Sequence, residues 1–156
     1  MKISSWNIQG IKKKQSVQEL KLLIRIHKPD MIFLLETLTN EINMLKVKPF
    51  LGFDHFDFFL PNNHSGGIDV LWNDGNIHTS VLLKKPRALH MLVHDTINAQ
   101  NSVVSMIYAP AQASHKLQFW ERLGEIDTVI DSPWCLLGDF NEMEGPNEKR
   151  GPGFIS

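Results

Sequence analysis

The segment over residues 136–141, Leu-Leu-Gly-Asp-Phe-Asn, restricts the possible folds of this chain more than any other segment. Its apolar run ends at Gly138, and an acid, Asp139, and an amide, Asn141, follow with one residue between them. A short apolar run that stops at turn-forming residues predicts a strand. The segment therefore predicts a buried strand with Asp139 and Asn141 at its mouth, where phosphate chemistry could use both side chains.

Three further segments repeat this design of a short apolar or alternating run before a polar side chain. They are Lys2–Trp6 before Asn7, Met31–Leu35 before Glu36, and Val103–Ile107 before Tyr108. Such runs predict strands. Because ligands collect outside the carboxyl ends of parallel strands, the polar groups at the four strand ends are expected to converge on one crevice.

Helical spacing of apolar residues lies between the first two of these strands. Residues 16–27 show this spacing, and Ser16 with Glu19 has the sequence of a capping box. The Lys-Pro-Asp sequence that follows ends the helix, because proline disfavours the α region at the residue before it. A helix between two short strands predicts a parallel crossover, which brings Asn7 and Glu36 to the same sheet edge.

A second crossover is predicted between the strands that end at Tyr108 and Asp139. Ser114 can cap its helix, and Asp131-Ser132-Pro133 ends it. Its apolar stripe consists of Leu117, Trp120, Leu123, Ile126 and Ile130.

The middle of the chain instead alternates short strands with turn clusters. The predicted strands are Phe53–Phe59, Ile68–Trp72, Ile77–Leu83 and Leu89–Val93. The clusters over 61–67 and 73–76 favour hairpins, so this part is interpreted as antiparallel. The whole is a mixed α/β protein, with sheet packed under helices.

Composition agrees with one domain over residues 1–156. The chain has 156 residues, of which 42% are hydrophobic, enough for a real core. No apolar run is long enough to span a membrane, and the first residues form a strand candidate rather than a signal peptide. The single cysteine, Cys135, is placed in a core strand and fits a reducing compartment. An intracellular location, nuclear or cytoplasmic, is expected.

The charge balance does not suggest binding to nucleic acid through charge alone. The net charge is −1, whereas such proteins usually carry a basic face. Two local basic runs, Lys12–Lys14 and Lys84–Arg87, are interpreted as solvated loops or as local contacts. The histidines at positions 55, 64, 78, 90 and 94 are interpreted as structural residues of loops and strands.

Five motifs in order together resemble a known superfamily. They are Ser5–Gly10, Glu36–Thr37, Gly66–Trp72, Tyr108–Pro110 and Gly138–Glu142. The set resembles the endonuclease/exonuclease/phosphatase superfamily, which includes apurinic/apyrimidinic endonucleases, pancreatic deoxyribonuclease and LINE-type retrotransposon endonucleases. The plant retrotransposon-like members are most similar, because a Glu-Lys-Arg-Gly stretch like that at 148–151 follows their aspartate motif.

The resemblance implies a four-layer α/β sandwich, of which this chain is a portion, and Mg²⁺-dependent cleavage of phosphate esters, with Mn²⁺ as an alternative ion. Glu36 resembles the metal-binding glutamate, with Asn7 helping to arrange metal and phosphate. Asp139 resembles an aspartate that contributes to the metal site and orients or deprotonates the attacking water. Tyr108 and Asn141 resemble the side chains that contact the phosphate. Nucleic acid is the expected substrate.

Each of these residues also has a structural interpretation. Asn7 can cap a turn before Gly10, and Asp139 with Asn141 can simply form a turn. The ring of Tyr108 can pack in the core while its hydroxyl contacts solvent. Glu36 can be a solvated strand end.

The chain departs from the family pattern in two ways. Position 9 is Gln where many repair nucleases have an acid, and none of the seven histidines follows Asn141. The resemblance implies a further aspartate and an Asp-His pair beyond this point, so a partial domain with impaired catalysis is expected. Self-association or aggregation would follow from an uncovered sheet face. The alternatives are a non-catalytic remnant that binds nucleic acid or protein, and a small-molecule phosphatase.

Overall fold

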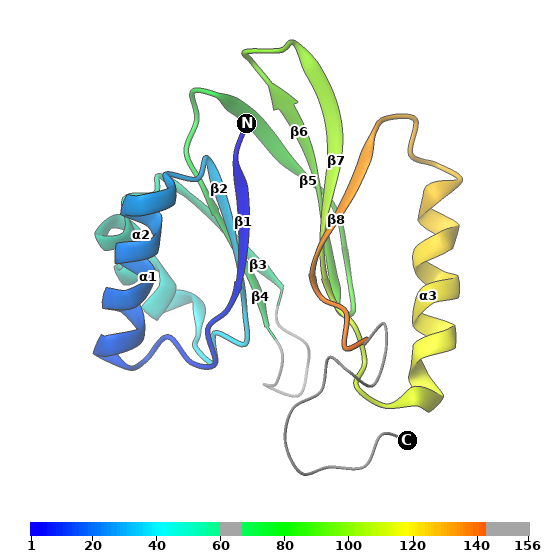
Figure 1. Ribbon diagram of the computed structural model, residues 1–156, viewed down its shortest axis with the longest axis horizontal. Helices are drawn as coiled ribbons and strands as arrows, with labels where there is room; N and C mark the ends of the chain where they lie inside the picture. Colours follow the sequence, from blue (N-terminus) through cyan, green and yellow to red (C-terminus); the bar gives the residue numbers. More distant parts are fainter. Residues whose placement is uncertain (60–66, 143–156) are drawn as a thin grey trace.

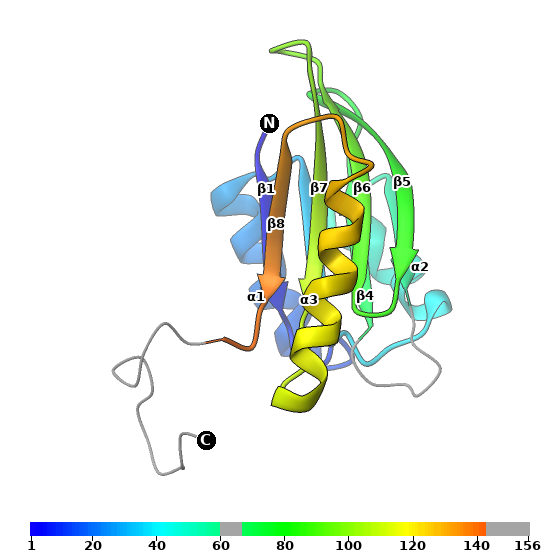
Figure 2. The ribbon, with the colours of Figure 1, turned by 90° about the vertical axis from the view of Figure 1, so that its right-hand side faces the viewer.

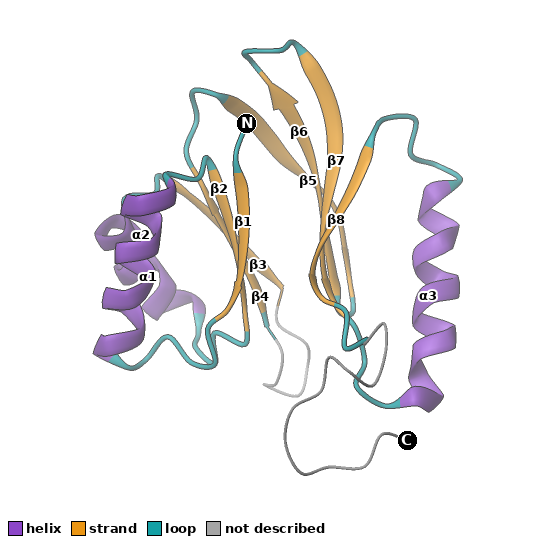
Figure 3. Ribbon diagram, in the orientation of Figure 1, coloured by secondary structure: helices purple, strands orange, loops and turns teal. Residues whose placement is uncertain are grey.

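The computed structural model describes residues 1–59 and 67–142. These residues form eight strands and three helices (Figures 1 and 3). In chain order they are β1 (Ile3–Asn7), α1 (Lys14–His27), β2 (Met31–Leu35), α2 (Glu41–Leu51), β3 (His55–Phe59), β4 (Ile68–Trp72), β5 (Ile77–Lys85), β6 (Ala88–Asp95), β7 (Gln100–Tyr108), α3 (Ala113–Asp127) and β8 (Trp134–Asp139). None of the described helices is long and apolar enough to cross a membrane.

Two four-stranded sheets face each other, and helices cover their outer faces. One sheet has the strand order β1-β2-β4-β3 and the other β5-β6-β7-β8. Figure 1 shows α1 and α2 outside the first sheet and α3 outside the second. The predicted mixed α/β class, with two mixed sheets flanked by helices, is confirmed.

An apolar layer between the sheets forms the main core. Its residues come from β2 and β4 on one side and from β5, β6 and β7 on the other. They are Met31, Phe33, Leu35, Ile68, Val70, Ile77, Leu89, Met91, Val93, Val104 and Met106. The intervening residues of β2, Ile32 and Leu34, face the other way, into a second cluster under α1 and α2. All five residues of β2 are therefore buried, which is typical of a strand covered on both faces.

Both predicted parallel crossovers are confirmed. β1 pairs with β2 in parallel, with Asn7 opposite Leu35. β7 pairs with β8 in parallel, with Tyr108 opposite Asp139. β1 and β8 also lie next to each other across the two sheets, and Figure 2 shows them side by side. The carboxyl ends of all four strands thus point to one end of the molecule.

Several local expectations were wrong. The first helix begins at Lys14 with Lys13 as its N-cap and no side-chain cap, so Ser16 lies inside the helix and forms no capping box. The second crossover helix likewise has Gln112 rather than Ser114 at its N-cap, and it ends at Asp127. In both cases the helix begins before the residue that the sequence favours as its cap.

The cluster over 73–76 does not make the expected hairpin. β4 before it pairs with β2 and β3, whereas β5 after it pairs with β6 in the other sheet. The antiparallel interpretation of the strand pairs themselves is confirmed. The other turn cluster, which includes His64, and the Glu-Lys-Arg-Gly stretch at 148–151 lie outside the described residues, apart from Gly67.

Cys135 is exposed rather than buried in a core strand. Within the described part of the chain β8 is the last strand of its sheet, so nothing there covers it on that side. Leu117, expected in the apolar stripe of the second crossover helix, is 70% exposed. Phe119 packs beneath that helix instead, together with the predicted Trp120, Leu123, Ile126 and Ile130.

Gly138 is a glycine at which a side chain would meet backbone, unlike Gly10, Gly52, Gly75 and Gly124. Its φ is 136°, and a Cβ atom there would overlap the carbonyl oxygen of Ile107 and lie 2.9 Å from that residue's nitrogen. Because Ile107 pairs with Gly138 across β7 and β8, the strands can approach this closely only without a side chain.

We therefore expect Gly138→Ala to lower the free energy of unfolding by about 3 kcal/mol or more, since the strands next to Asp139 must move apart. Gly75→Ala is the matched control, because Gly75 has a similar φ of 131° but nothing within 4 Å of its Cβ position. It should lose only about 1 kcal/mol, from backbone strain. Urea unfolding of both variants measures the difference, and equal losses would contradict the close-approach argument.

Candidate active site at the strand ends

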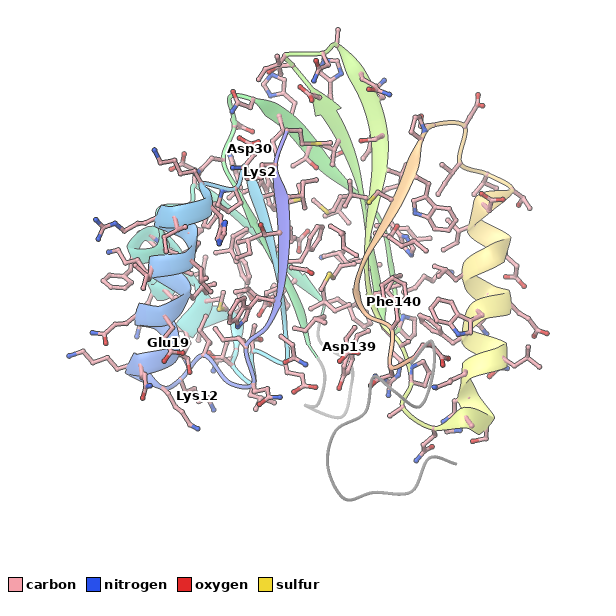
Figure 4. All side chains as sticks on the ribbon, viewed as in Figure 1. Lys2, Lys12, Glu19, Asp30, Asp139 and Phe140 are labelled. Carbon is pink, nitrogen blue, oxygen red and sulfur yellow. The ribbon has the colours of Figure 1, made fainter. Side chains whose placement is uncertain are left out.

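One hydrogen bond joins the two sheets at their carboxyl ends. The Tyr108 hydroxyl, at the end of β7, donates to Oε1 of Glu36, directly after β2, at 2.6 Å. Asp139 ends β8 beside Tyr108, and Figure 4 shows it at the lower end of that strand, where the two sheets meet. The structure thus brings together the three side chains that were predicted from separate strand ends.

The backbone of Glu36 is held in an unusual conformation. Its φ is 53°, in the left-handed region, which costs a non-glycine residue about 1–2 kcal/mol. Its N–H donates to the Gly67 carbonyl at 3.1 Å, and its own carbonyl accepts from Gly10 at 2.9 Å. These bonds from two neighbouring loops hold the strained residue in place and direct its carboxylate.

Asn141 ties the end of β8 to the end of β7. Its backbone N–H donates to Oδ1 of Asp139 at 3.0 Å, and its side-chain amide donates to the Ala109 carbonyl at 2.7 Å. Its φ of 48° is also left-handed. Lys116, on α3, donates to the Asn141 carbonyl at 2.6 Å and pairs with Glu142 at 3.1 Å. Asn141 is therefore a structural link here as well as a candidate phosphate contact.

Asn7 makes a turn at the end of β1. Its side-chain oxygen accepts from the N–H of Gln9 at 3.3 Å, an Asx turn that Gln9 completes with a φ of 48°. The structural interpretation of Asn7 is thus realised. Its place opposite Leu35 still puts it next to Glu36.

The surroundings of Tyr108 keep its hydroxyl protonated. The hydrogen bond to Glu36, followed by burial and the negative charges of Glu36 and Asp139, raises the pKa of Tyr108 to about 12, against a lowering effect of Arg87. The Arg87 guanidinium lies 5.4 Å from the centre of the tyrosine ring. At neutral pH Tyr108 is therefore a hydrogen-bond donor, and both carboxylates contribute to its electrostatic environment.

The carboxylate oxygens at the strand ends suit a hard cation such as Mg²⁺ only if most of the other ligands of the ion come from outside the protein. Among the described residues, no group of three or more His, Cys, Asp or Glu side chains is placed to hold a metal ion. Oε2 of Glu36 and Oδ2 of Asp139 have no hydrogen-bond partner within the described part of the chain. Mg²⁺ is usually bound through one or two carboxylates, with water and substrate phosphate completing its shell. These two side chains meet that requirement.

Three residues near the site were not predicted as site residues from the sequence. Lys116 and Arg87 lie in a helix and a hairpin turn whose spacing carries no signal, although Arg87 belongs to a basic run that was noted. Thr37, after Glu36, is fully buried, and no described residue forms a hydrogen bond with its hydroxyl. Only the resemblance marked Thr37, as part of the Glu-Thr motif.

Asp69, on β4, is a buried carboxyl next to this region. It is 3% exposed, and burial raises its pKa to about 6, although Thr37 lowers it in part. The two side chains are near each other, yet neither the Thr37 hydroxyl nor Oδ2 of Asp69 has a partner in hydrogen-bonding geometry. The ionised form of Asp69 is therefore disfavoured in the folded protein.

Asp69→Asn should stabilise the fold at pH 7 by about 3 kcal/mol, the order of the shift from 3.8 to about 6. Because the folded-state pKa is raised, the stability contributed by Asp69 is fully present below its unfolded pKa and is lost as the pH rises through about 6. The gain from asparagine should thus vanish below pH 4.

Urea unfolding from pH 3.5 to 8 measures this gain. Asp127→Asn, at an exposed helix position, is the control and should change stability little at any pH. A gain for Asp69→Asn that does not vary with pH would show that burial of the charge is not its cause.

Comparisons with known proteins agree with this geometry. Residues 4–154 match the model of the Endonuclease/Exonuclease/phosphatase family, and the chain belongs to that family. No curated protein matches the chain.

Solved structures share the fold. The human Nocturnin catalytic domain with bound sulfate matches with a TM-score of 0.62 and 16% identity over 91% of this chain and 65% of that one. An AP endonuclease from Archaeoglobus fulgidus has a TM-score of 0.68 and 18% identity over 97% and 61%. Humanized D. rerio TDP2 has a TM-score of 0.61 and 14% identity over 92% and 67%. The chain thus spans about two thirds or less of the length of these neighbours.

Proposed function

We propose that this chain carries the site of a divalent-cation-dependent phosphodiesterase that acts on nucleic acid. The observation that carries the proposal is the 2.6 Å hydrogen bond between Tyr108 and Glu36, which unites acidic strand ends of both sheets in one site. Family membership supports phosphate-ester chemistry. The AP endonucleases among the structural neighbours support nucleic acid as the substrate class.

We further propose a relation to retrotransposon-type endonucleases within the family. Support comes from the sequence alone: Gln at position 9 in place of an acid, and the Glu-Lys-Arg-Gly stretch at 148–151.

In this proposal Glu36 and Asp139 hold the cation, Mg²⁺ or Mn²⁺, with Asn7 beside them. The bound ion supplies charge that stabilises the phosphate oxygens. Asp139 also orients the attacking water and accepts its proton. Tyr108 has a single O–H, which donates to Glu36, so contact with a phosphate oxygen requires this hydroxyl to turn from Glu36 to the phosphate. Asn141 positions the loop after β8 and contacts a second oxygen.

A non-catalytic nucleic-acid-binding role is the second candidate. This role is favoured because two side chains of the site already form hydrogen bonds within the protein. The Asn7 oxygen accepts from Gln9, and the Asn141 amide donates to Ala109. No histidine lies at the described site to protonate a leaving group or a phosphate. A positioned acid–base group typically contributes about 10²–10⁴-fold in rate.

A metal titration tests the first part of the proposal. We expect Mn²⁺ to broaden backbone amide resonances near residues 36 and 139, with weak affinity because only two carboxylates contribute. Glu36→Gln should abolish the effect. Glu19→Gln, on the outer side of α1 (Figure 4), should leave it unchanged. Broadening scattered over the surface would refute a shared cation site.

Nicking of supercoiled plasmid tests catalysis. We expect the chain to nick slowly or not at all with Mg²⁺, because no histidine lies among the described residues of the site to act as a positioned general acid. A family C-terminal segment supplied in trans should increase nicking, and Asp139→Asn should remove the increase.

Asp131→Asn, an exposed change outside the strand ends, is the matched control and should behave like the unaltered chain. Efficient nicking by the chain alone, lost in Asp139→Asn, would show a working enzyme and exclude the binding-only role. Nicking that survives Asp139→Asn would come from a contaminant.

A further inference from the structure

A groove lies between α3 and the hairpin of β5 and β6, outside the strand-end site. Its volume is about 630 Å³, within the usual range for small-molecule sites. Neither Glu36, Tyr108 nor Asp139 lines it. Figure 2 shows the cause: α3 crosses in front of β7 and β6 and leaves β5 uncovered.

The wall and floor of the groove are apolar apart from one group. Phe119, Leu123 and Ile126 of α3 line one side, and Leu83 and Ala88 line the other. His90, on β6, also lines the groove and is 0% exposed. Its Nε2 has no hydrogen-bond partner among residues 1–59 and 67–142. A buried polar atom without a partner is rare in native proteins and requires an explanation.

The hydrogen bonds behind His90 define which of its nitrogens carries the proton. The Trp134 indole N–H donates to Oγ of Ser105 at 2.7 Å, and that oxygen lies 2.6 Å from Nδ1 of His90. All three groups are satisfied only if the serine hydroxyl donates to Nδ1. Nε2 then carries the hydrogen. Burial, followed by the charge of Lys85, lowers the pKa of His90 to about 4, so the ring is neutral at pH 7 and offers an N–H donor.

The rim of the groove is mostly cationic. Lys85, Arg87 and Arg122 line it, with Glu125 as the acidic group and His115 nearby. Lys85, Arg87 and Arg122 are exposed, and none of them forms a salt bridge with another described residue. Arg87 also lies over the Tyr108 ring of the strand-end site, so the charges available to an anionic group at the mouth are those of Lys85 and Arg122.

We propose that this groove binds a small, flat apolar acid. Its carboxylate lies at the Lys85 and Arg122 rim, its apolar body packs on Phe119 and Leu123, and a hydrogen-bond acceptor at its far end receives the N–H of His90. The cationic rim then contacts the carboxylate, the apolar wall contacts the apolar body, and Nε2 of His90 gains a hydrogen-bond partner. This site is separate from the proposed phosphodiesterase function and does not depend on it.

The probe that tests this is 6-hydroxy-2-naphthoate, titrated into the full chain and followed by amide NMR. We expect saturable shifts confined to groove residues and to the indole N–H of Trp134, which reports on His90 through Ser105. The neutral 6-hydroxy-2-naphthamide should bind about tenfold more weakly, since it lacks the charge. Plain 2-naphthoate lacks the far acceptor and should lose the Trp134 shift.

Protein variants give an independent arm. Arg122→Gln, at an exposed position, should weaken naphthoate binding about tenfold, whereas Arg25→Gln, exposed on α1, should not. Equal binding of acid and amide, an unchanged affinity in Arg122→Gln, or shifts outside the groove would overturn the proposal. Broadening of groove resonances with protein concentration alone, without probe, would show that a second copy fills the groove and would overturn it too.

Discussion

The apolar layer between the two sheets is the constraint on which the candidate site depends. β2 is buried on both faces, with Phe33 toward the other sheet and Leu34 toward the helices. A one-residue slip would exchange these faces, so packing rather than local propensity sets the register. With this register all five residues of β2 are buried, and Glu36 is the first residue after them that lies outside the core. The facing sheet, held by the same layer, brings Tyr108 within 2.6 Å of it.

Backbone strain gathers where these strand ends meet. Gln9, Glu36 and Asn141 all adopt left-handed conformations without being glycine, each at a cost of about 1–2 kcal/mol. Hydrogen bonds from neighbouring loops hold them, as at Gly10 and Gly67 on either side of Glu36. Residues in sparsely populated conformations persist only where surroundings hold them, and such residues cluster at binding and catalytic sites. The backbone strain therefore supports a functional site at these strand ends, and this argument does not depend on any single side chain.

The sequence predicted those parts of the fold that local patterns decide. The strands that end at Asn7, Glu36, Tyr108 and Asp139 follow from short apolar runs, and a helix between two of them requires parallel pairing.

The same patterns missed α2, because Pro49 lies inside this helix and its apolar residues lack a clear face. The same patterns wrongly predicted a hairpin at residues 73–76. Whether the strand after this turn pairs within the same sheet or joins the other sheet depends on tertiary packing, which local patterns do not report. Ser16 shows a third limit, since a good capping sequence does not form a cap when the helix begins before it.

The sequence predicted that the polar residues at the four strand ends lie close together, but not which hydrogen bonds their side chains form. Resemblance could suggest that both asparagines face a phosphate, yet Asn7 bonds to Gln9 and Asn141 to Ala109. The Asn7 bond shapes the loop after β1, whose Gly10 N–H donates to the Glu36 carbonyl, and Asn141 shapes the loop after β8, where its N–H donates to Asp139. Substitution of either asparagine would therefore alter the surroundings of Glu36 or Asp139 as well as remove a contact. Glu36 and Asp139 each keep one oxygen without a partner among the described residues. Those two oxygens are thus not used within the described part of the protein, whereas use of the asparagine side chains by a phosphate would compete with the bonds that hold the loops.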